Sequence, residues 1–240
     1  MNNRAKLIVP AIAAITCAPA LAGGMQLDTD SRYRLYDLSG ETSNFPPDFY
    51  SDFIEGPPPT SFTDWDYTHS AAIPDVQLDA SHSSSVSSTA LVAQGDIAAT
   101  STTGNFNYGG IFTVAAFNDY TIRFTLLTET SFDLDASLSA SGQQASSSVM
   151  LRDLNSNTTV YTASTNDIPI TIDESFTLAA GSYEFSLQAN LLSFVYPYNA
   201  SASYNGTLAV VPTPSVLTAI FATGFLTIRR RREEGRIHHE

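Results

Sequence analysis

The fold is decided by the stretch Phe132–Ser141, which reads FDLDASLSAS. Apolar side chains stand at every second position, and aspartate or serine stands between them. This period of two is typical of an antiparallel strand with one buried face and one face in water. A second stretch, Tyr183–Leu191, alternates in the same way as YEFSLQANL. We therefore expect two long strands that point Leu134 and Leu187 into a common core.

Shorter segments of the same kind surround these two stretches. They lie near residues 76–80, 85–93, 112–116, 120–127, 149–154, 159–163, 168–172, 176–178 and 203–210. Turn-forming pairs such as Asn118-Asp119 and Asn205-Gly206 separate them, and the second pair favours a two-residue hairpin turn. No helical period is evident between residues 23 and 211. The sequence predicts an all-β protein, an antiparallel β-sandwich.

The run Phe176–Phe185 reads FTLAAGSYEF, a strand, a glycine and a second alternating strand. It resembles the edge of jelly-roll modules in secreted bacterial proteins. We therefore expect a jelly-roll-like sandwich in preference to an immunoglobulin-like one.

The segment 23–70 has a different composition. Residues 32–38 favour one strand, but Pro46-Pro47 and Pro57-Pro58-Pro59 follow among scattered aromatic and aspartate residues. Proline cannot donate to a strand ladder, so most of this segment is predicted to be irregular. The β-sandwich domain is accordingly expected over 71–211.

The first 22 residues have the layout of a secretory signal peptide. Arg4 and Lys6 precede an apolar helix, and Ala20-Leu21-Ala22 provides small residues for cleavage before Gly23. We expect the chain to be exported.

The end of the chain, 212–240, also has a signal-like layout. Val211-Pro212-Thr213-Pro214-Ser215 precedes an apolar run of 13 residues, 216–228, and then four arginines. Such a helix is about 20 Å long, shorter than a bilayer core requires. The arginines predict that this end of the hydrophobic helix stays on the cytoplasmic side of the membrane.

These residues resemble the PEP-CTERM sorting signal of bacterial surface proteins. The resemblance is carried by Val211, Pro212, Pro214, Ser215, Gly224, Arg229, Arg230, Arg231 and Arg232. Thr213 departs from the family pattern, which has glutamate there. The resemblance implies cleavage by an exosortase-like membrane protease after transient anchoring in the membrane. It also implies a destination at the cell envelope, the outer surface or the extracellular matrix of exopolysaccharide-producing bacteria.

Charge and motifs narrow the functional classes. The net charge is −13, and Arg32, Arg34, Arg123 and Arg152 are the only basic residues between 23 and 211. Such an acidic chain repels nucleic acid, which we do not expect as a partner. No familiar catalytic motif occurs, His69 and His82 have no metal-ligand spacing, and we interpret both as surface or turn residues. No enzyme activity and no obligatory cofactor are expected.

Two binding hypotheses remain open. Asp64 and Asp66 stand two apart among prolines, where a loop would let them share a calcium ion. Alternatively, the two-residue spacing means only that both side chains lie on the solvent-exposed face of a strand. Phe62, Trp65 and Tyr67 could stack on sugar rings, or could instead pin their segment to the sandwich.

The sequence thus favours a secreted structural or interaction protein of the cell surface. The alternatives are a carbohydrate-binding module that recognises extracellular polysaccharide and a hydrolase that works through carboxylates. A smooth serine face would support the first hypothesis, an exposed aromatic platform the second, and facing carboxylates in a cleft the third.

Overall fold

The computed structural model describes residues 24–41, 49–56, 62–73, 76–101, 111–142, 144–194 and 199–212. Residues 23–212 form one compact unit. The predicted signal peptide with its cleavage site, and the sorting signal from Thr213 onward, lie outside the described residues.

Strands occupy almost all of the described chain. They are β1 (Met25–Asp30), β2 (Tyr33–Glu41), β3 (Phe49–Gly56), β4 (Trp65–Ile73), β5 (Val76–Val86), β6 (Ala90–Ser101), β7 (Ile111–Leu126), β8 (Thr130–Ser141), β9 (Ala145–Asp153), β10 (Thr158–Thr165), β11 (Ile170–Leu178), β12 (Gly181–Phe194) and β13 (Ala200–Val210). The prediction of an all-β chain is confirmed.

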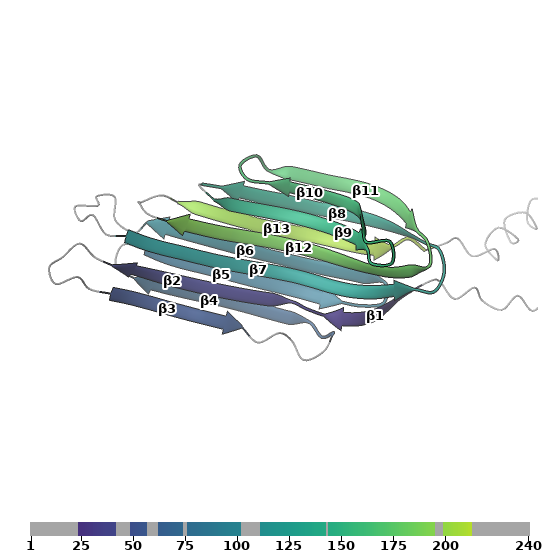
Figure 1. The fold of residues 1–240 in the computed structure, drawn as a ribbon, viewed down its shortest axis with the longest axis horizontal. Coiled ribbons are helices and arrows are strands. Elements are labelled where there is room, and N and C mark those ends of the chain that lie inside the picture. Colours follow the sequence, from purple (N-terminus) through teal and green to yellow (C-terminus); the bar gives the residue numbers. More distant parts are fainter. Residues whose placement is uncertain are drawn as a thin grey trace, which may run out of the picture. The chain divides into compact units, whose positions relative to one another are not determined.

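The strands form two antiparallel sheets that pack as a sandwich (Figure 1). Sheet A has the order β10-β9-β12-β7-β2-β3, with β1 paired to the far end of β7. Sheet B has the order β11-β8-β13-β6-β5-β4. The last two strands are central, because β12 lies between β9 and β7 and β13 lies between β8 and β6. Strands of opposite sheets touch throughout, as β12 does with β13 and β2 with β4.

The alternation in the sequence predicts the core correctly. Leu134 and Leu138 of β8 are buried, and so are Tyr183, Phe185 and Leu187 of β12. The two strands belong to opposite sheets, so their apolar faces meet across the core. On the outer side of sheet A the alternation is misleading. It assigns Ser186 to solvent, but this residue is only 4% exposed. Its cross-strand neighbours, Thr121 and Met150, flank it in the middle of the sheet.

The prediction that residues 23–70 are mostly irregular is wrong. This segment supplies β1, β2, β3 and the start of β4, and it extends both sheets. The expected strand at 32–38 corresponds to β2. The prolines at 46–47 and 57–59 fall between the strands in sequence, outside the described residues, so the ladders themselves do not need proline donors. The sandwich therefore begins near residue 25 and not at 71.

Two predicted turns are also wrong, and each has a packing reason. Asn118-Asp119 lies inside β7, where Asn118 is fully buried and hydrogen-bonded. Asn205-Gly206 lies inside β13. A Cβ at Gly206 would come within 2.9 Å of Leu187 Cδ1 from the facing sheet. Gly206 therefore permits close approach of the two sheets, and no turn is needed to explain it.

Candidate functional site

Sheet B presents an outer face of hydroxyl, amide and carboxylate groups. Rows that follow the strand pairing across β4, β5, β6, β13 and β8 include Thr68-Ser81-Asp96-Ser203-Ser139 and Asp66-Ser83-Gln94-Asn205-Ser137. All four described arginines lie on or beside strands of sheet A. The outer face of sheet B is therefore a serine-rich acidic surface.

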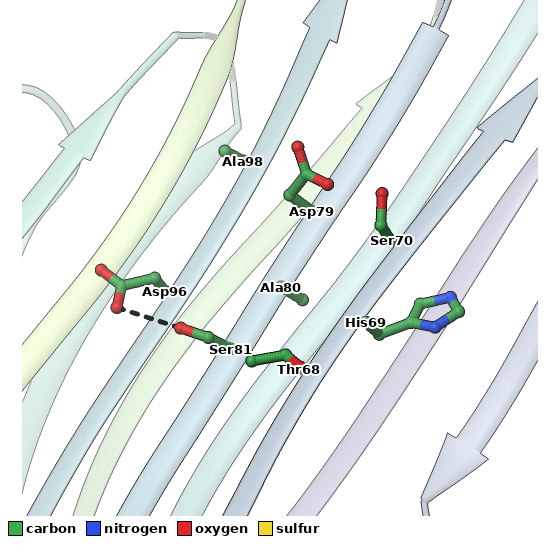
Figure 2. Close-up of a pocket in the computed structure, with 8 residues that line it drawn as sticks. All are labelled: Thr68, His69, Ser70, Asp79, Ala80, Ser81, Asp96 and Ala98. Atoms are coloured by element: carbon green, nitrogen blue, oxygen red, sulfur yellow. Dashed lines mark hydrogen bonds between the residues drawn. The ribbon is translucent and has the colours of Figure 1, made fainter.

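A groove of about 410 Å³ lies on this surface over β4, β5 and β6 (Figure 2). It is lined by Thr68, His69, Ser70, Asp79, Ala80, Ser81, Asp96 and Ala98. Ser81 donates a hydrogen bond to Asp96 at 3.3 Å. Hydrogen bonds from Ser70 and Gln77 lower the pKa of the Asp79 carboxyl. A glycosidase acid needs a raised pKa, so Asp79 is suited to accepting hydrogen bonds or binding cations.

The two aspartates proposed to bind calcium line a neighbouring groove of about 220 Å³. Asp64 and Asp66 are exposed there beside Ser83, Gln94 and Asn205. Asp64 precedes β4, whereas Asp66 lies on it, so the pair is not wholly in a loop as expected. Within the described ranges, no group of three or more histidine, cysteine or acidic side chains is arranged to hold a metal. Calcium binding stays a prediction.

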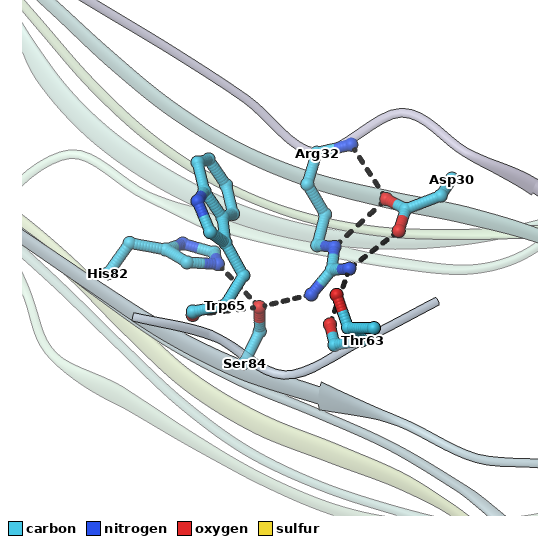
Figure 3. Close-up of polar contacts among 6 residues, drawn as sticks. All are labelled: Asp30, Arg32, Thr63, Trp65, His82 and Ser84. Carbon is cyan, nitrogen blue, oxygen red and sulfur yellow. Dashed lines mark hydrogen bonds and ion pairs between the residues drawn. The ribbon is translucent and has the colours of Figure 1, made fainter. Parts of the chain in front are cut away.

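The interior between the two sheets contains a second polar region near β1, β2, β4 and β5. Arg32 is fully buried and pairs with Asp30, whose Oδ2 lies 2.6 Å from Nη2 and whose Oδ1 accepts from Nε at 2.9 Å (Figure 3). It also donates to the Thr63 carbonyl at 2.7 Å and to Ser84 Oγ at 2.9 Å. Arg32 therefore joins the first strands of sheet A to β5 and to the residues before β4 in sheet B.

Beside it, His82, Ser84, Asn118 and Tyr204 form a hydrogen-bonded set that we call the His82 network. His82 Nδ1 lies 2.8 Å from Asn118 Oδ1, and Nε2 lies 2.8 Å from Ser84 Oγ. The Asn118 amide donates to the Ser81 carbonyl at 2.7 Å, which fixes its oxygen toward His82. The Tyr204 hydroxyl donates to the same oxygen at 3.1 Å.

The His82 network has the residue types of a hydrolase triad, but its surroundings suit a structural role and not catalysis. Burial lowers the pKa of His82 to about 4, although the hydrogen bond that His82 makes to the Asn118 oxygen acts in the opposite direction. Ser84 is 5% exposed, and its oxygen already accepts a hydrogen bond from Arg32. A nucleophile needs an accessible hydroxyl with a free lone pair toward substrate. The network therefore crosslinks the sheets, and Gly95 makes room for it because a Cβ there would lie 2.5 Å from the Tyr204 ring.

Next to this network, side chains of β2 and β4 interleave. We call Arg34, Tyr36, Tyr67 and His69 the β2–β4 cluster. The Arg34 Cζ lies 3.0 Å from the Tyr67 ring centroid and 5.2 Å from that of Trp65. Tyr36 stacks on Tyr67 at 6.1 Å and on His69 at 5.9 Å. This cluster is a ladder of one cation and three rings between the two sheets.

The β2–β4 cluster is incompletely satisfied. Arg34 Nε and Nη1, the Tyr36 hydroxyl and His69 Nε2 are buried without a hydrogen-bond partner. Desolvation lowers the pKa of Arg34. Burying a charge costs several kcal/mol, whereas a desolvated cation–π contact contributes about 2 kcal/mol. The aromatic contacts therefore offset only part of the cost of placing Arg34 here.

The three residues proposed to bind sugar lie on the inner side of this region. Trp65 packs on His82 with ring centroids 4.6 Å apart, Tyr67 lies against Arg34, and Phe62 packs on the core. These contacts cover ring surface that a stacked sugar would use. Sugar binding by these rings stays a prediction.

Sequence reasoning missed the histidines. His82, expected at the surface, is 2% exposed, and His69 is half-buried in the β2–β4 cluster. The signal was available in part, because His82 shares the parity of Leu78 and Ala80 along β5. A serine-rich composition concealed it, since Ser84 follows the same inward parity.

Within the part of the chain that the structure describes, no helix has the length and apolarity to cross a membrane. No protein-family model matches the sequence, and no curated protein is significantly similar to it.

Among solved structures, a mutant VP2 protein of infectious bursal disease virus in T=1 particles is similar over 78% of this chain and 70% of that chain. The identity is 10% and the TM-score 0.21. The VP2 subviral particle of the same virus covers 94% and 95%, with 11% identity and a TM-score of 0.15. At these TM-scores neither likeness identifies a fold or a function.

Proposed function

We propose that this chain is an exported structural or interaction protein of the bacterial cell surface or matrix, without enzymatic activity. The observation that carries the proposal is the outer face of sheet B. It is broad, rich in serine and aspartate, and free of large aromatic side chains in its described rows. A smooth polar face of this kind suits a solvated surface protein better than a stacking platform does.

We also propose that β6–β13 form a jelly roll. Eight strands with the orders β6-β13-β8-β11 and β7-β12-β9-β10 have the connectivity of two Greek keys closed over each other. In this interpretation β2 and β3 extend one sheet, and β4 and β5 extend the other.

The sorting signals support the surface location. β13 ends at Val210, and the Val211 amide donates to the Ser131 carbonyl at 2.8 Å. The motif at 211–215 therefore starts where the described part of the sandwich ends, and its prolines favour an extended backbone that suits a protease. In this proposal an exosortase-like enzyme cleaves there, after the short helix has held the chain in the membrane.

Intact-mass analysis of protein isolated from the surface of producing cells tests this proposal. We expect a species that begins at Gly23 and lacks residues 225–232. In a matched variant with Arg229–Arg232 replaced by serine, retention and cleavage should both decline. A mature species that still carries the arginine block would contradict the sorting proposal.

A separate measurement distinguishes the carbohydrate-binding alternative from the structural proposal. A polysaccharide-binding screen on the exported protein should be negative for binding that depends on Phe62, Trp65 and Tyr67, because their rings are engaged internally. Saturable binding to a neutral polysaccharide would favour the alternative.

A further inference from the structure

The β2–β4 cluster contains several polar atoms whose hydrogen-bonding capacity is unused. They are Arg34 Nε and Nη1, the Tyr36 hydroxyl and His69 Nε2. Buried polar groups in folded proteins almost always have partners, so several orphans in one place need an explanation. Arg34 is 8% exposed and Tyr36 1% exposed, so bulk water does not provide one.

These side chains pack together because of their places on two facing strands. Arg34 and Tyr36 are two residues apart on β2, and both point into the interior. Both lie against Tyr67 of β4, at 3.0 Å from Arg34 Cζ to the ring centroid and 6.1 Å between the tyrosine ring centroids. His69 follows two residues later on β4 and stacks on Tyr36 at 5.9 Å.

The chemistry of the orphans is that of donors. The guanidinium has only N–H groups, the tyrosine hydroxyl donates, and a neutral histidine donates from one nitrogen. The ion pairs among the described residues join Arg32 to Asp30 and Arg123 to Glu184, and neither involves Arg34. A buried cation beside further hydrogen-bond donors suits an oxyanion.

We propose that the β2–β4 cluster binds the carboxylate of a small molecule, with Arg34 as the charged partner and Tyr36 and His69 as further hydrogen-bond donors. This inference is independent of the proposed surface function. His69 is half-buried, and its ring stacks on Tyr36 in the interior and points away from the other residues of the outer groove (Figure 2). β4 is the edge strand of its sheet, so the ligand enters at an open side of the sandwich.

Charge selects a monoanion over a phosphate or a polyanion. One guanidinium balances one negative charge, whereas phosphate carries close to two at neutral pH. The net charge of −13 adds a repulsion that grows with the charge of the ligand. The rings of Tyr67 and Trp65 are already covered by Arg34 and His82, so the cluster selects a ligand by its charge and not by stacking.

The test titrates the full-length protein with D-glucuronate, acetate, D-glucose and inorganic phosphate at equal ionic strength. Calorimetry measures binding, and thermal melting measures stabilisation. We expect saturable binding of glucuronate and of acetate, and none of glucose. At a 100-fold excess over Kd, the glucuronate complex should melt roughly 5 °C or more above the free protein.

Variants assign the binding to the cluster. Arg34→Met should abolish the response and raise the melting temperature of the ligand-free protein, because an uncompensated buried charge is removed. Tyr36→Phe deletes one hydroxyl and should weaken binding by roughly fivefold. Arg123→Met is the matched control, since that arginine side chain is 51% exposed on the outer side of sheet A, and it should bind as the parent does.

Several outcomes would overturn the proposal. They are no binding of any carboxylate, equal binding of glucose and glucuronate, tighter binding of phosphate than of glucuronate, or an unchanged response in Arg34→Met. If Arg34→Met fails to fold, Tyr36→Phe decides, because an unaltered affinity in that variant excludes its hydroxyl as a donor to the ligand.

Discussion

One half of the sandwich interior, around β8, β9, β12 and β13, is filled almost entirely by aliphatic and aromatic side chains. Leu134, Leu151, Phe185 and Leu187 there are all fully buried. The other half, around β2, β4 and β5, contains Arg32, the His82 network and the β2–β4 cluster. Both halves lie in one unit and are closed by the same antiparallel ladders. They differ in what makes burial favourable.

In the apolar half, each side chain contributes through the area it removes from water, and its neighbours need only match its shape. In the polar half, each group depends on one particular partner. Arg32 has every partner it needs, whereas Arg34 has ring contacts alone. In the apolar half, a substitution should therefore change the free energy of unfolding in proportion to the side-chain volume it removes. In the polar half, a substitution should have a large effect when it breaks a pair.

The largest effect should come from Arg32→Met. This change leaves the Asp30 carboxylate, 7% exposed, without its counter-ion and removes two further hydrogen bonds. We expect a loss of about 3–5 kcal/mol in the free energy of unfolding, measured by denaturant melts. Arg34→Met is the matched control and should be neutral or stabilising. Equal losses in the two variants would remove the distinction between paired and unpaired arginines.

Leu187→Ala probes the apolar half. Leu187 is fully buried and contacts the space left by Gly206, so the substitution opens a cavity between the sheets. The expected loss is about 2–5 kcal/mol. Ser137→Ala on the exposed face of β8 should change stability by less than about 0.5 kcal/mol. Comparable losses in chemical denaturation would mean that the assigned strand faces are inverted.

The pH dependence of stability should separate the halves further. Burial lowers the pKa of His82 from 6.5 to about 4. Between these values the unfolded chain binds a proton that the folded chain does not, so stability is complete above pH 6.5 and falls toward pH 4. The expected loss is about 3 kcal/mol. His82→Gln should flatten this part of the profile. Asp79, whose pKa is lowered by hydrogen bonds, and Asp119, whose pKa is raised by burial, contribute equally in both proteins. Parallel profiles would show that His82 is protonated in the folded state.

The smallest effect is expected from calcium at the outer face. Asp64 and Asp66 supply two carboxylates beside neutral oxygens of Ser83, Gln94 and Asn205, too few charges for tight binding. About 5 mM calcium should raise the melting temperature by no more than roughly 2 °C. The rise should disappear when both aspartates are replaced by asparagine. A large, saturable rise would make this groove a metal site and the outer face functionally specialised.

The same division explains what could be predicted from the sequence. β8 and β12 were predictable because Leu134 and Leu187 stand in strict alternation with polar residues, and burial by area leaves that period in the sequence. β2 and β4 were obscured because their inward residues include Arg34 and His69, which a hydropathy pattern assigns to solvent. Hydrogen-bonded pairs leave no periodic pattern in the sequence, because the partners can be far apart. The Asn118–His82 pair, for example, joins residues 36 positions apart.

Two strands were divided or interrupted in the prediction for related reasons. Asn118 resembles a turn residue but fills a hydrogen-bonding position inside β7. Gly206 resembles half of a hairpin turn but serves the packing of Leu187 across the core. In both cases a facing sheet, which is remote in sequence, decides the role of the residue. The β2–β4 cluster could not be predicted for the same reason: its donors come from two strands in different sheets.

The central positions of β12 and β13 have a consequence for the order of folding. β13 joins β6 to β8 in sheet B, with Ala200 opposite Ala99 and Ser201 opposite Ser141. Neither sheet can be continuous until the segment 181–210, which contains β12 and β13, has been synthesised. Closing such distant pairs costs chain entropy before it is repaid, so folding should be slow and late. A chain that folds late stays unfolded for longer, and during that time it can still pass through a narrow channel.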